Sequence, residues 1–183
     1  MTIFSRSLFV TISLLLLSAC STLPENLKSE DPQLVSDYTV WQSKPTASGD
    51  VRLGGVIAKV TNLQSKTRVE VVNLPISSNG KPDISQEPQG RFVGYIDGYA
   101  EPASLAQGRL ITLLGQSIGT EQGAVGDYEY AFPVMQVQGF HLWRIEERVR
   151  IQEVDSYLYP CRGLYCREVR HSSRQGTVIQ EVK

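Results

Sequence analysis

The sequence predicts a mainly β protein whose core is a small antiparallel barrel of five to six strands. From Val51 onward, short runs of β-branched and aromatic residues are separated by glycine, asparagine and proline, with almost no 3.6-residue periodicity. The run near 90–99 alternates glycines with large residues, which suits a tightly curved sheet. The run near 128–143 places apolar residues from Tyr128 to Val134 at a period of two, which is typical of a strand.

The chain begins with a targeting signal. Arg6 precedes the apolar stretch 8–17, and the small residues Ser18 and Ala19 follow it. Ten residues of helix reach about 15 Å, half of a hydrocarbon core of about 30 Å, so this stretch is too short for a permanent membrane span. Residues 1–19 are therefore predicted to be a signal peptide that is removed.

The sequence Leu17-Ser18-Ala19-Cys20 resembles the lipobox of bacterial lipoproteins, in which a cysteine is acylated before the preceding peptide bond is cut. The thiol of Cys20 is the nucleophile that would carry a thioether-linked diacylglycerol, and two or three fatty chains hold a protein firmly to a membrane. The alternative is an ordinary signal peptide followed by a buried or disulfide-bonded cysteine. Ser21 stands where an aspartate would favour the inner membrane, so we expect delivery to the outer membrane.

Residues 20–45 are predicted to form a lipidated tether. The segment is polar and contains Pro24, Pro32 and Pro45. Asp31-Pro32 offers an N-cap and a first helical residue for a short helix, which would need the domain to hold it.

Residues 46–147 are predicted to form the β domain. A phase shift of the apolar residues between Val71 and Leu74 suggests a bulge, and segment 101–107 suggests one or two turns of helix. Five strands with this spacing resemble a partly open barrel of the oligonucleotide/oligosaccharide-binding (OB) type. The strands are expected near residues 51–63, 67–76, 90–99, 109–117 and 128–143, the last of them bent or divided.

Length and charge limit the classes of protein. Removal of 19 residues from 183 leaves enough chain for one domain with a core, and two full domains are not expected. The mature chain keeps 19 acidic residues and, without Arg6, 17 basic ones, which gives 17 − 19 = −2. Such a near-neutral balance argues against a nucleic-acid partner, which normally leaves a clustered basic footprint.

Residues 148–183 are predicted to be a variable C-terminal tail. It contains Cys161 and Cys166, and an oxidising compartment allows a disulfide between them, with Gly163 bending the loop. Free thiols and a metal site that includes His171 are the alternatives. The cysteine spacing is unlike that of most metal sites, so we favour the disulfide and predict no metal.

Several short motifs together are similar to the Slp family of starvation-inducible outer-membrane lipoproteins, from the lipobox to about Trp143. The resemblance implies anchoring through Cys20, an outer-membrane location in a Gram-negative bacterium and a link to starvation or stress. It supplies no catalytic residue. The motifs are Arg52-Leu53-Gly54-Gly55-Val56-Ile57, Leu74-Pro75, Lys81-Pro82-Asp83-Ile84, Gln89-Gly90-Arg91, Ile111-Thr112-Leu113-Leu114-Gly115, Gly119 and Gly139-Phe140-His141-Leu142-Trp143.

The chain shows none of the common catalytic motifs that we sought, and we predict that it is not an enzyme and uses no cofactor other than covalent lipid. His141 lies in an apolar and aromatic strand, so a histidine with structural partners is favoured over a catalytic base. Asp97 and Glu129 each lie between apolar or small residues and could form a carboxylate pair, but the solvated face of a sheet explains them better.

Five aromatic residues are candidates for a surface that stacks on sugar rings or a peptide. Core packing explains most of them as well. They are Tyr95, Tyr99, Tyr128, Tyr130 and Trp143.

Two functions from different classes follow. The favoured one is a non-enzymatic envelope protein whose anchored domain contributes to envelope stability or to contacts with other envelope proteins under stress. The alternative is a module that binds glycan, a peptidoglycan fragment or another small envelope ligand on a barrel face. The membrane is the partner expected from the anchor, and the sequence leaves the oligomeric state open.

Overall fold

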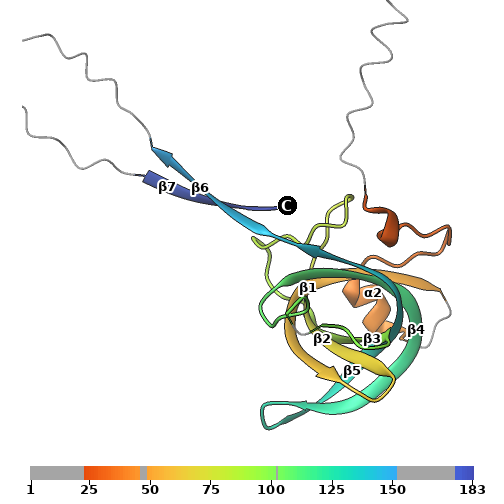
Figure 1. Cartoon of the computed structure of the whole chain (residues 1–183). Helices are drawn as coiled ribbons and strands as arrows, with labels where there is room; N and C mark the ends of the chain where they lie inside the picture. Colours follow the sequence, from red (N-terminus) through yellow and green to blue (C-terminus); the bar gives the residue numbers. More distant parts are fainter. Residues whose placement is uncertain (1–22, 46–48, 102, 152–175) are drawn as a thin grey trace, which may run out of the picture.

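A computed structural model describes residues 23–45, 49–101, 103–151 and 176–183, which are mainly β, as predicted. In this part of the chain, five strands form one closed ring and two more form a separate sheet (Figure 1). The ring consists of β1 (Asp50–Asn62), β2 (Lys66–Leu74), β3 (Gly90–Asp97), β4 (Leu110–Val125) and β5 (Tyr128–Trp143).

The strands follow one another around the ring in the order β1-β2-β3-β5-β4, and β4 pairs back onto β1. Four of the five pairings are antiparallel, whereas β3 and β5 are parallel from Val93↔Val134 to Tyr95↔Gln136. The prediction of an antiparallel sheet is therefore wrong at this pair. An odd number of strands cannot alternate in direction all the way around a closed ring, so one pair must be parallel.

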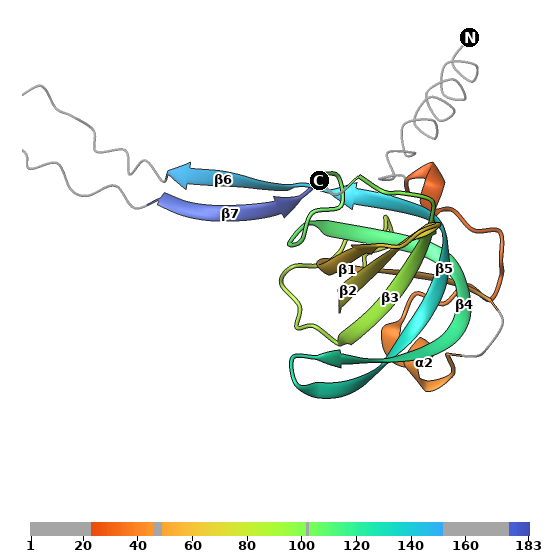
Figure 2. The ribbon, with the colours of Figure 1, turned by 60° about the horizontal axis from the view of Figure 1, so that its bottom comes forward.

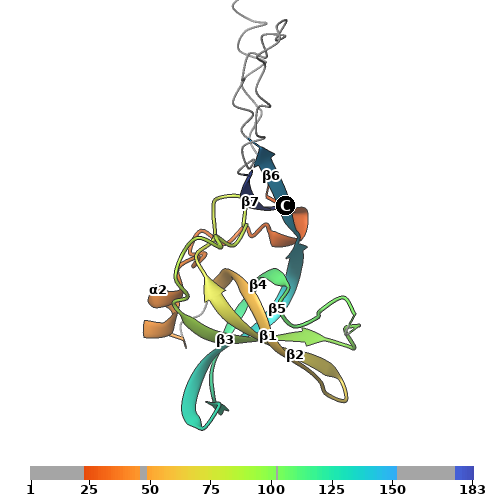
Figure 3. The same ribbon diagram turned by 90° about the vertical axis from the view of Figure 1, so that its left-hand side faces the viewer.

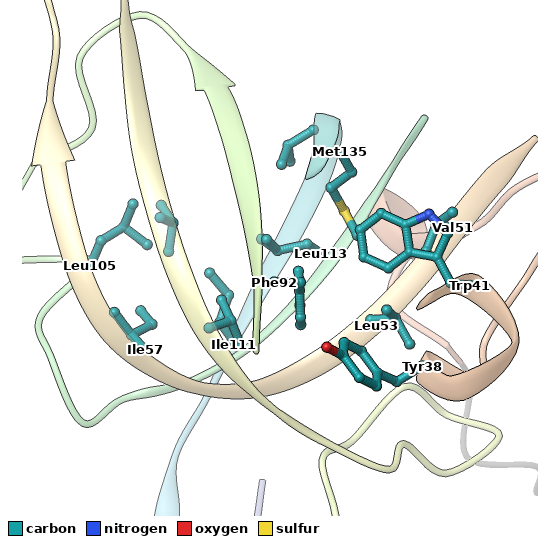
Figure 4. Close-up of a cluster of buried hydrophobic side chains, with 13 residues drawn as sticks. Tyr38, Trp41, Val51, Leu53, Ile57, Phe92, Leu105, Ile111, Leu113 and Met135 are labelled. Atoms are coloured by element: carbon teal, nitrogen blue, oxygen red, sulfur yellow. The ribbon is translucent and has the colours of Figure 1, made fainter. Parts of the chain in front are cut away.

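The inside of the ring holds the main apolar core (Figure 4). Side chains that alternate along each strand point inward, and Gly94 leaves space for Leu113, whose Cδ1 would lie 2.5 Å from an added Cβ. Leu105 lies at one end of the cluster, and Tyr38 and Trp41 lie at the other. The strand residues of this core are Val51, Leu53, Ile57, Val69, Val71, Phe92, Ile111, Leu113, Met135 and Val137.

The segment before β1 packs onto the ring at two places. The short 3₁₀-helix η1 (Glu25–Leu27) lies against β4 and β5, and Leu27 is fully buried. The helix α2 (Tyr38–Ser43) begins at Asp37, whose side chain caps it, and not at the Asp31-Pro32 position considered from the sequence. Residues 23–45 were interpreted as tether, yet they add three fully or almost fully buried side chains to the fold.

The outer half of the β4–β5 hairpin bends away from the ring axis and reaches β2 and β3 (Figure 2). An irregularity in the pairing between Ser117 and Gly119 makes this bend possible, and Gly119 has a φ of 106°, which disfavours side chains. Another irregularity lies in β1 between Ile57 and Lys59. The bulge expected in the second strand is therefore found in its partner strand, opposite Val71.

Two connections between strands of the ring contain turns. Gly80, with a φ of 81°, donates its amide hydrogen to the carbonyl oxygen of Ser77 at 2.8 Å, so Asn79-Gly80 forms a turn between β2 and β3. In the described part of segment 101–107 the chain forms turns and no helix.

The last two strands, β6 (Ile145–Ile151) and β7 (Gly176–Val182), pair with each other in antiparallel fashion. We call this two-stranded sheet the arm. It projects from the ring at the end where β5 finishes (Figures 1 and 3). Most of these residues lie in the segment 148–183, which was predicted to be a tail and here includes paired strands.

The contacts of α2 predict that residues 23–45 contribute to folding stability. Trp41 is 2% exposed, its indole lies edge-on to Phe92, and its Nε1 donates to Ser117 Oγ at 2.8 Å. We expect Trp41→Ala, in the chain purified without lipid, to lower the free energy of unfolding by about 3–5 kcal/mol in a urea titration.

The neighbouring Val40 is 56% exposed and provides the control. Val40→Ala should change the free energy of unfolding by less than about 0.5 kcal/mol. Equal stability of the two variants would show that α2 is only loosely attached to the ring.

Candidate functional site

The predicted lipidation residue, Cys20, and the predicted disulfide pair, Cys161 and Cys166, all lie outside the described residues. The described chain starts at Leu23, three residues after Cys20. No helix in the described ranges has both the length and the apolar character needed to cross a bilayer.

The start of the described chain lies on an apolar cluster outside the ring. Leu23 packs against it, and Leu27 is part of it together with Leu74, Leu110, Leu114 and Trp143. Gly139 of β5 lets η1 approach closely, because a Cβ there would lie 2.0 Å from the carbonyl oxygen of Asn26. We call this set the anchor-end cluster, since it holds the chain just after Cys20.

Hydrogen bonds hold the anchor-end cluster and its neighbouring segments in place. The indole Nε1 of Trp143 donates to Thr112 Oγ1 at 2.9 Å, and Thr112 donates to the carbonyl oxygen of Gly80 at 2.6 Å. The guanidinium of Arg52 donates to the carbonyl oxygen of Leu27 at 3.2 Å. These bonds tie η1 and the 77–80 turn to β1, β4 and β5.

The outer face of β2 and β3 carries a network of charged side chains. The carboxylate of Glu70, 6% exposed, lies between Arg91 at 2.7 Å and Arg68 at 3.5 Å. Arg68 also contacts Glu121 of the β4–β5 hairpin at 2.6 Å, and the Tyr95 hydroxyl donates to the same carboxylate at 2.7 Å. Two carboxylates and two guanidiniums therefore balance one another and fasten the hairpin to the ring.

Proton affinities in this network follow from burial and pairing. Burial alone would lower the pKa of Arg68, but Glu121 and Glu70 more than offset it and raise that pKa. The pKa of the Tyr95 phenol is raised by burial and by the nearby Glu121 carboxylate. Both groups stay protonated at neutral pH, so Arg68 keeps its positive charge and the Tyr95 hydroxyl keeps the hydrogen that it donates to Glu121.

A groove lies beside the network, between the tip of the hairpin and the start of β3. It has a volume of about 380 Å³ and is open to solvent. The Tyr130 hydroxyl at its wall accepts the amide hydrogen of Arg91 at 3.1 Å and lies 3.1 Å from the Tyr38 hydroxyl. The groove is lined by Val72, Pro88, Gln89, Gly90, Arg91, Val125 and Tyr130.

The five aromatic residues proposed as a ligand surface do not lie together. Tyr95 and Tyr130 both pack against one apolar cluster, formed by Val93, Phe132 and Val134, on the outside of β3 and β5. Trp143 is buried in the anchor-end cluster, whereas Tyr99 and Tyr128 are 72% and 81% exposed. A role in ligand binding stays a prediction for each of them.

The residues considered as a catalytic acid or base are His141, Asp97 and Glu129. His141 lies edge-on to Trp143, with ring centroids 4.4 Å apart, and burial lowers its pKa. Asp97 accepts a hydrogen bond from Gln136, and both Asp97 and Glu129 are exposed. Among the described residues, no group of three or more His, Cys, Asp or Glu side chains could hold a metal ion.

The charged network was not predicted from the sequence. The alternation Arg68-Val69-Glu70-Val71 in β2 places charges on one face of a strand whose other face is apolar. In β3, the charged Arg91 likewise precedes the apolar Phe92. This signal was available, but such charges usually face solvent. Here the β4–β5 hairpin covers them.

The model of the outer membrane lipoprotein Slp family matches residues 17–171. The chain is 32% identical to the uncharacterized lipoprotein YeaY of Escherichia coli (strain K12), over 81% of this chain and 79% of that protein. It is 30% identical to the outer membrane protein Slp of the same organism, over 73% and 72%, and 35% identical to an uncharacterized protein of Haemophilus influenzae, over 76% of each. No solved structure matches the chain.

The lowered pKa of His141 predicts a pH dependence of stability. The unfolded histidine, with its ordinary pKa of 6.5, binds protons more readily than the folded one. At a pH well above 6.5 the histidine is neutral in both states and does not lower the free energy of unfolding. As the pH drops below 6.5, the unfolded state gains a proton first and the free energy of unfolding falls. Chemical denaturation at about pH 7.5 and about pH 5.5 should show this loss, and His141→Gln should reduce it. An identical pH dependence in the variant and the wild type would contradict the assignment.

Proposed function

The chain belongs to the outer membrane lipoprotein Slp family, and on this basis we propose that it is a non-enzymatic envelope protein attached to the outer membrane through lipid on Cys20. Its ring is held at the membrane surface, where it contributes to envelope stability or to contacts with other envelope proteins. The link of this role to starvation or stress rests on the family resemblance.

The observation that carries this proposal is the packing of η1 on the ring. Leu23 contacts the anchor-end cluster and Leu27 is buried in it. Only three residue steps separate the Cys20 thiol from Leu23, and three residues span at most about 11 Å. A lipid on Cys20 therefore holds the ring beside the headgroups, and a long tether is not available.

The outer face of the ring supports a structural role. The charges of Glu70, Arg68 and Glu121 are paired with one another, and the Tyr95 hydroxyl is engaged by the same network. Groups in such a network stabilise the fold and the position of the hairpin. We infer that this face keeps the ring rigid.

We also infer that the ring is a barrel of the OB type, as the sequence analysis expected. The strand order with β3 beside β5 and the parallel register of that pair support this inference. Barrels of this type use the outer surface of the second and third strands, and the neighbouring loops, for binding. In this chain the β4–β5 hairpin lies over part of that surface.

The groove beside the hairpin favours a second candidate function, a module that binds a glycan, a peptidoglycan fragment or another small envelope ligand. It combines apolar walls at Val72 and Val125 with the polar groups of Arg91 and Tyr130. A few polar groups in a mostly apolar hollow are typical of ligand sites.

The anchor gives the first test. We expect Cys20→Ala in the full precursor to remove the protein from the outer-membrane fraction, because the acylated thiol is lost. The control is the Cys161→Ser/Cys166→Ser variant, which keeps the lipid site and should fractionate like the wild type. Immunoblots of separated membranes measure both. Outer-membrane fractionation of Cys20→Ala at the wild-type level would refute the anchor.

The alternative function makes a different prediction. Peptidoglycan fragments titrated into the unlipidated chain should give saturable binding, followed by calorimetry, and Val125→Arg should weaken it at least about tenfold by filling the groove. Ile118→Ala changes an exposed residue of β4 that does not line the groove, so it should leave the affinity unchanged. No saturation up to about 1 mM fragment would rule out this alternative.

A further inference from the structure

The arm exposes apolar side chains that the proposed function leaves unexplained. β6 and β7 pair only with each other among the described strands. Nine large apolar residues of the described chain are exposed, and four of them lie in these two short strands: Ile145, Val149, Val178 and Ile179. The exposed large apolar residues of the described chain are therefore concentrated in the arm.

The arm has two different faces, because side chains alternate along each strand. One face presents the cross-strand pairs Ile145↔Val182 and Val149↔Val178, and we call it the apolar face. Between these pairs, Gln180 Nε2 donates to Glu147 Oε1 at 2.9 Å.

The opposite face carries most of the charge. Lys183 contacts Glu146 at 2.8 Å, and Arg148 lies 3.8 Å from Glu181. Ile179 is the large apolar residue on this side, across from Arg148. The arm is therefore an amphipathic ribbon.

The base of the arm lies at the anchor end of the ring. Val182 packs against the same anchor-end cluster as Leu23. The backbones of Arg144 and Lys183 exchange two hydrogen bonds, of 2.6 and 2.7 Å, and close the base of the arm. Figure 2 shows η1 and the start of the arm at the same end of the molecule. The arm thus begins beside the point where a lipid on Cys20 would enter the membrane.

We propose that the apolar face of the arm is a lipid-binding surface that lies in the headgroup region of the membrane holding the Cys20 lipid. This inference rests on the proposed anchor. Ile145, Val149 and Val178 enter the boundary with the acyl chains, Val182 packs against the ring, and the opposite face remains in water. The Glu147–Gln180 pair in the middle of the apolar face limits the depth, because a carboxylate is costly in the hydrocarbon core.

The size of the apolar face favours lipid over a second copy of the chain. In the described part of the chain, two strands of seven residues cover about 24 Å by 10 Å, or roughly 240 Å². A stable protein interface usually buries about 800 Å² on each partner. A small apolar face next to an acyl anchor adds to membrane affinity without needing such an area.

A fluorescence experiment on the full lipidated chain tests the proposal. In a Cys161→Ser/Cys166→Ser background, Val149→Cys on the apolar face carries an environment-sensitive fluorophore, and the matched control is Thr177→Cys on the opposite face. The protein is reconstituted in vesicles of phosphatidylethanolamine and phosphatidylglycerol that contain nitroxide lipids. Quenching should be about threefold or more stronger at Val149 than at Thr177, since the apolar face sits about 5–10 Å into the interface.

Each other outcome counts against the proposal. Equal quenching at both sites in protein that sediments with the vesicles would overturn the lipid surface and leave the anchor intact. A Val149 label that is shielded from water but not quenched by lipid would assign the face to a protein partner. Protein that does not sediment at all would overturn the anchor and the inference together.

A second pair of variants avoids labels. In the unlipidated chain, Val149→Asp with Val178→Asp should weaken binding to the same vesicles at least roughly tenfold, through the loss of two buried apolar side chains. Thr177→Asp adds a negative charge to the other face and should change binding much less. Equal losses for the double and control variants would contradict the proposal.

Discussion

The burial of Leu27 on the outside of the ring is the interaction on which the arrangement of this protein depends. Without it, the chain between Cys20 and α2 would be a linker, and the distance of the ring from Cys20 would vary. With it, η1 is fixed to β4 and β5, and Gly139 allows the close approach that this contact requires. The same cluster holds Val182 at the base of the arm. One apolar cluster thus places the start of the described chain and the base of the arm at one end of the molecule.

The charged network and the β4–β5 hairpin keep the ring rigid. A ring of five strands has one parallel pair, which here extends over only three residue pairs. The hairpin crosses this region and is held by Glu121 to Arg68 and Tyr95. The charges of this face stabilise the joint where the ring has its shortest pairing.

The sequence predicted the strands well and the connections poorly. The fifth strand was expected at residues 128–143 and is found there, because its alternation of apolar residues is strong. The fourth strand was expected to end near 117 but continues to Val125. Its second half was missed because Thr120-Glu121-Gln122 is polar and shows no apolar alternation. Glu121 is held there by Arg68 of β2 and Tyr95 of β3. Tyr38 and Trp41 were hidden in a polar segment, and isolated aromatic residues carry no periodic signal. The groove, the network and the arm depend on contacts between segments that are distant in the sequence. A local residue pattern does not predict such contacts.

The distance between the ring and the bilayer tests the central claim most directly. Neutron reflectometry of the lipidated protein on a supported bilayer would measure it. The packing of η1 predicts that protein density begins within about 11 Å of the headgroups, the reach of three residues. A flexible linker over residues 20–45 would instead give a hydrated gap of about 28 Å, and observation of such a gap would contradict the account.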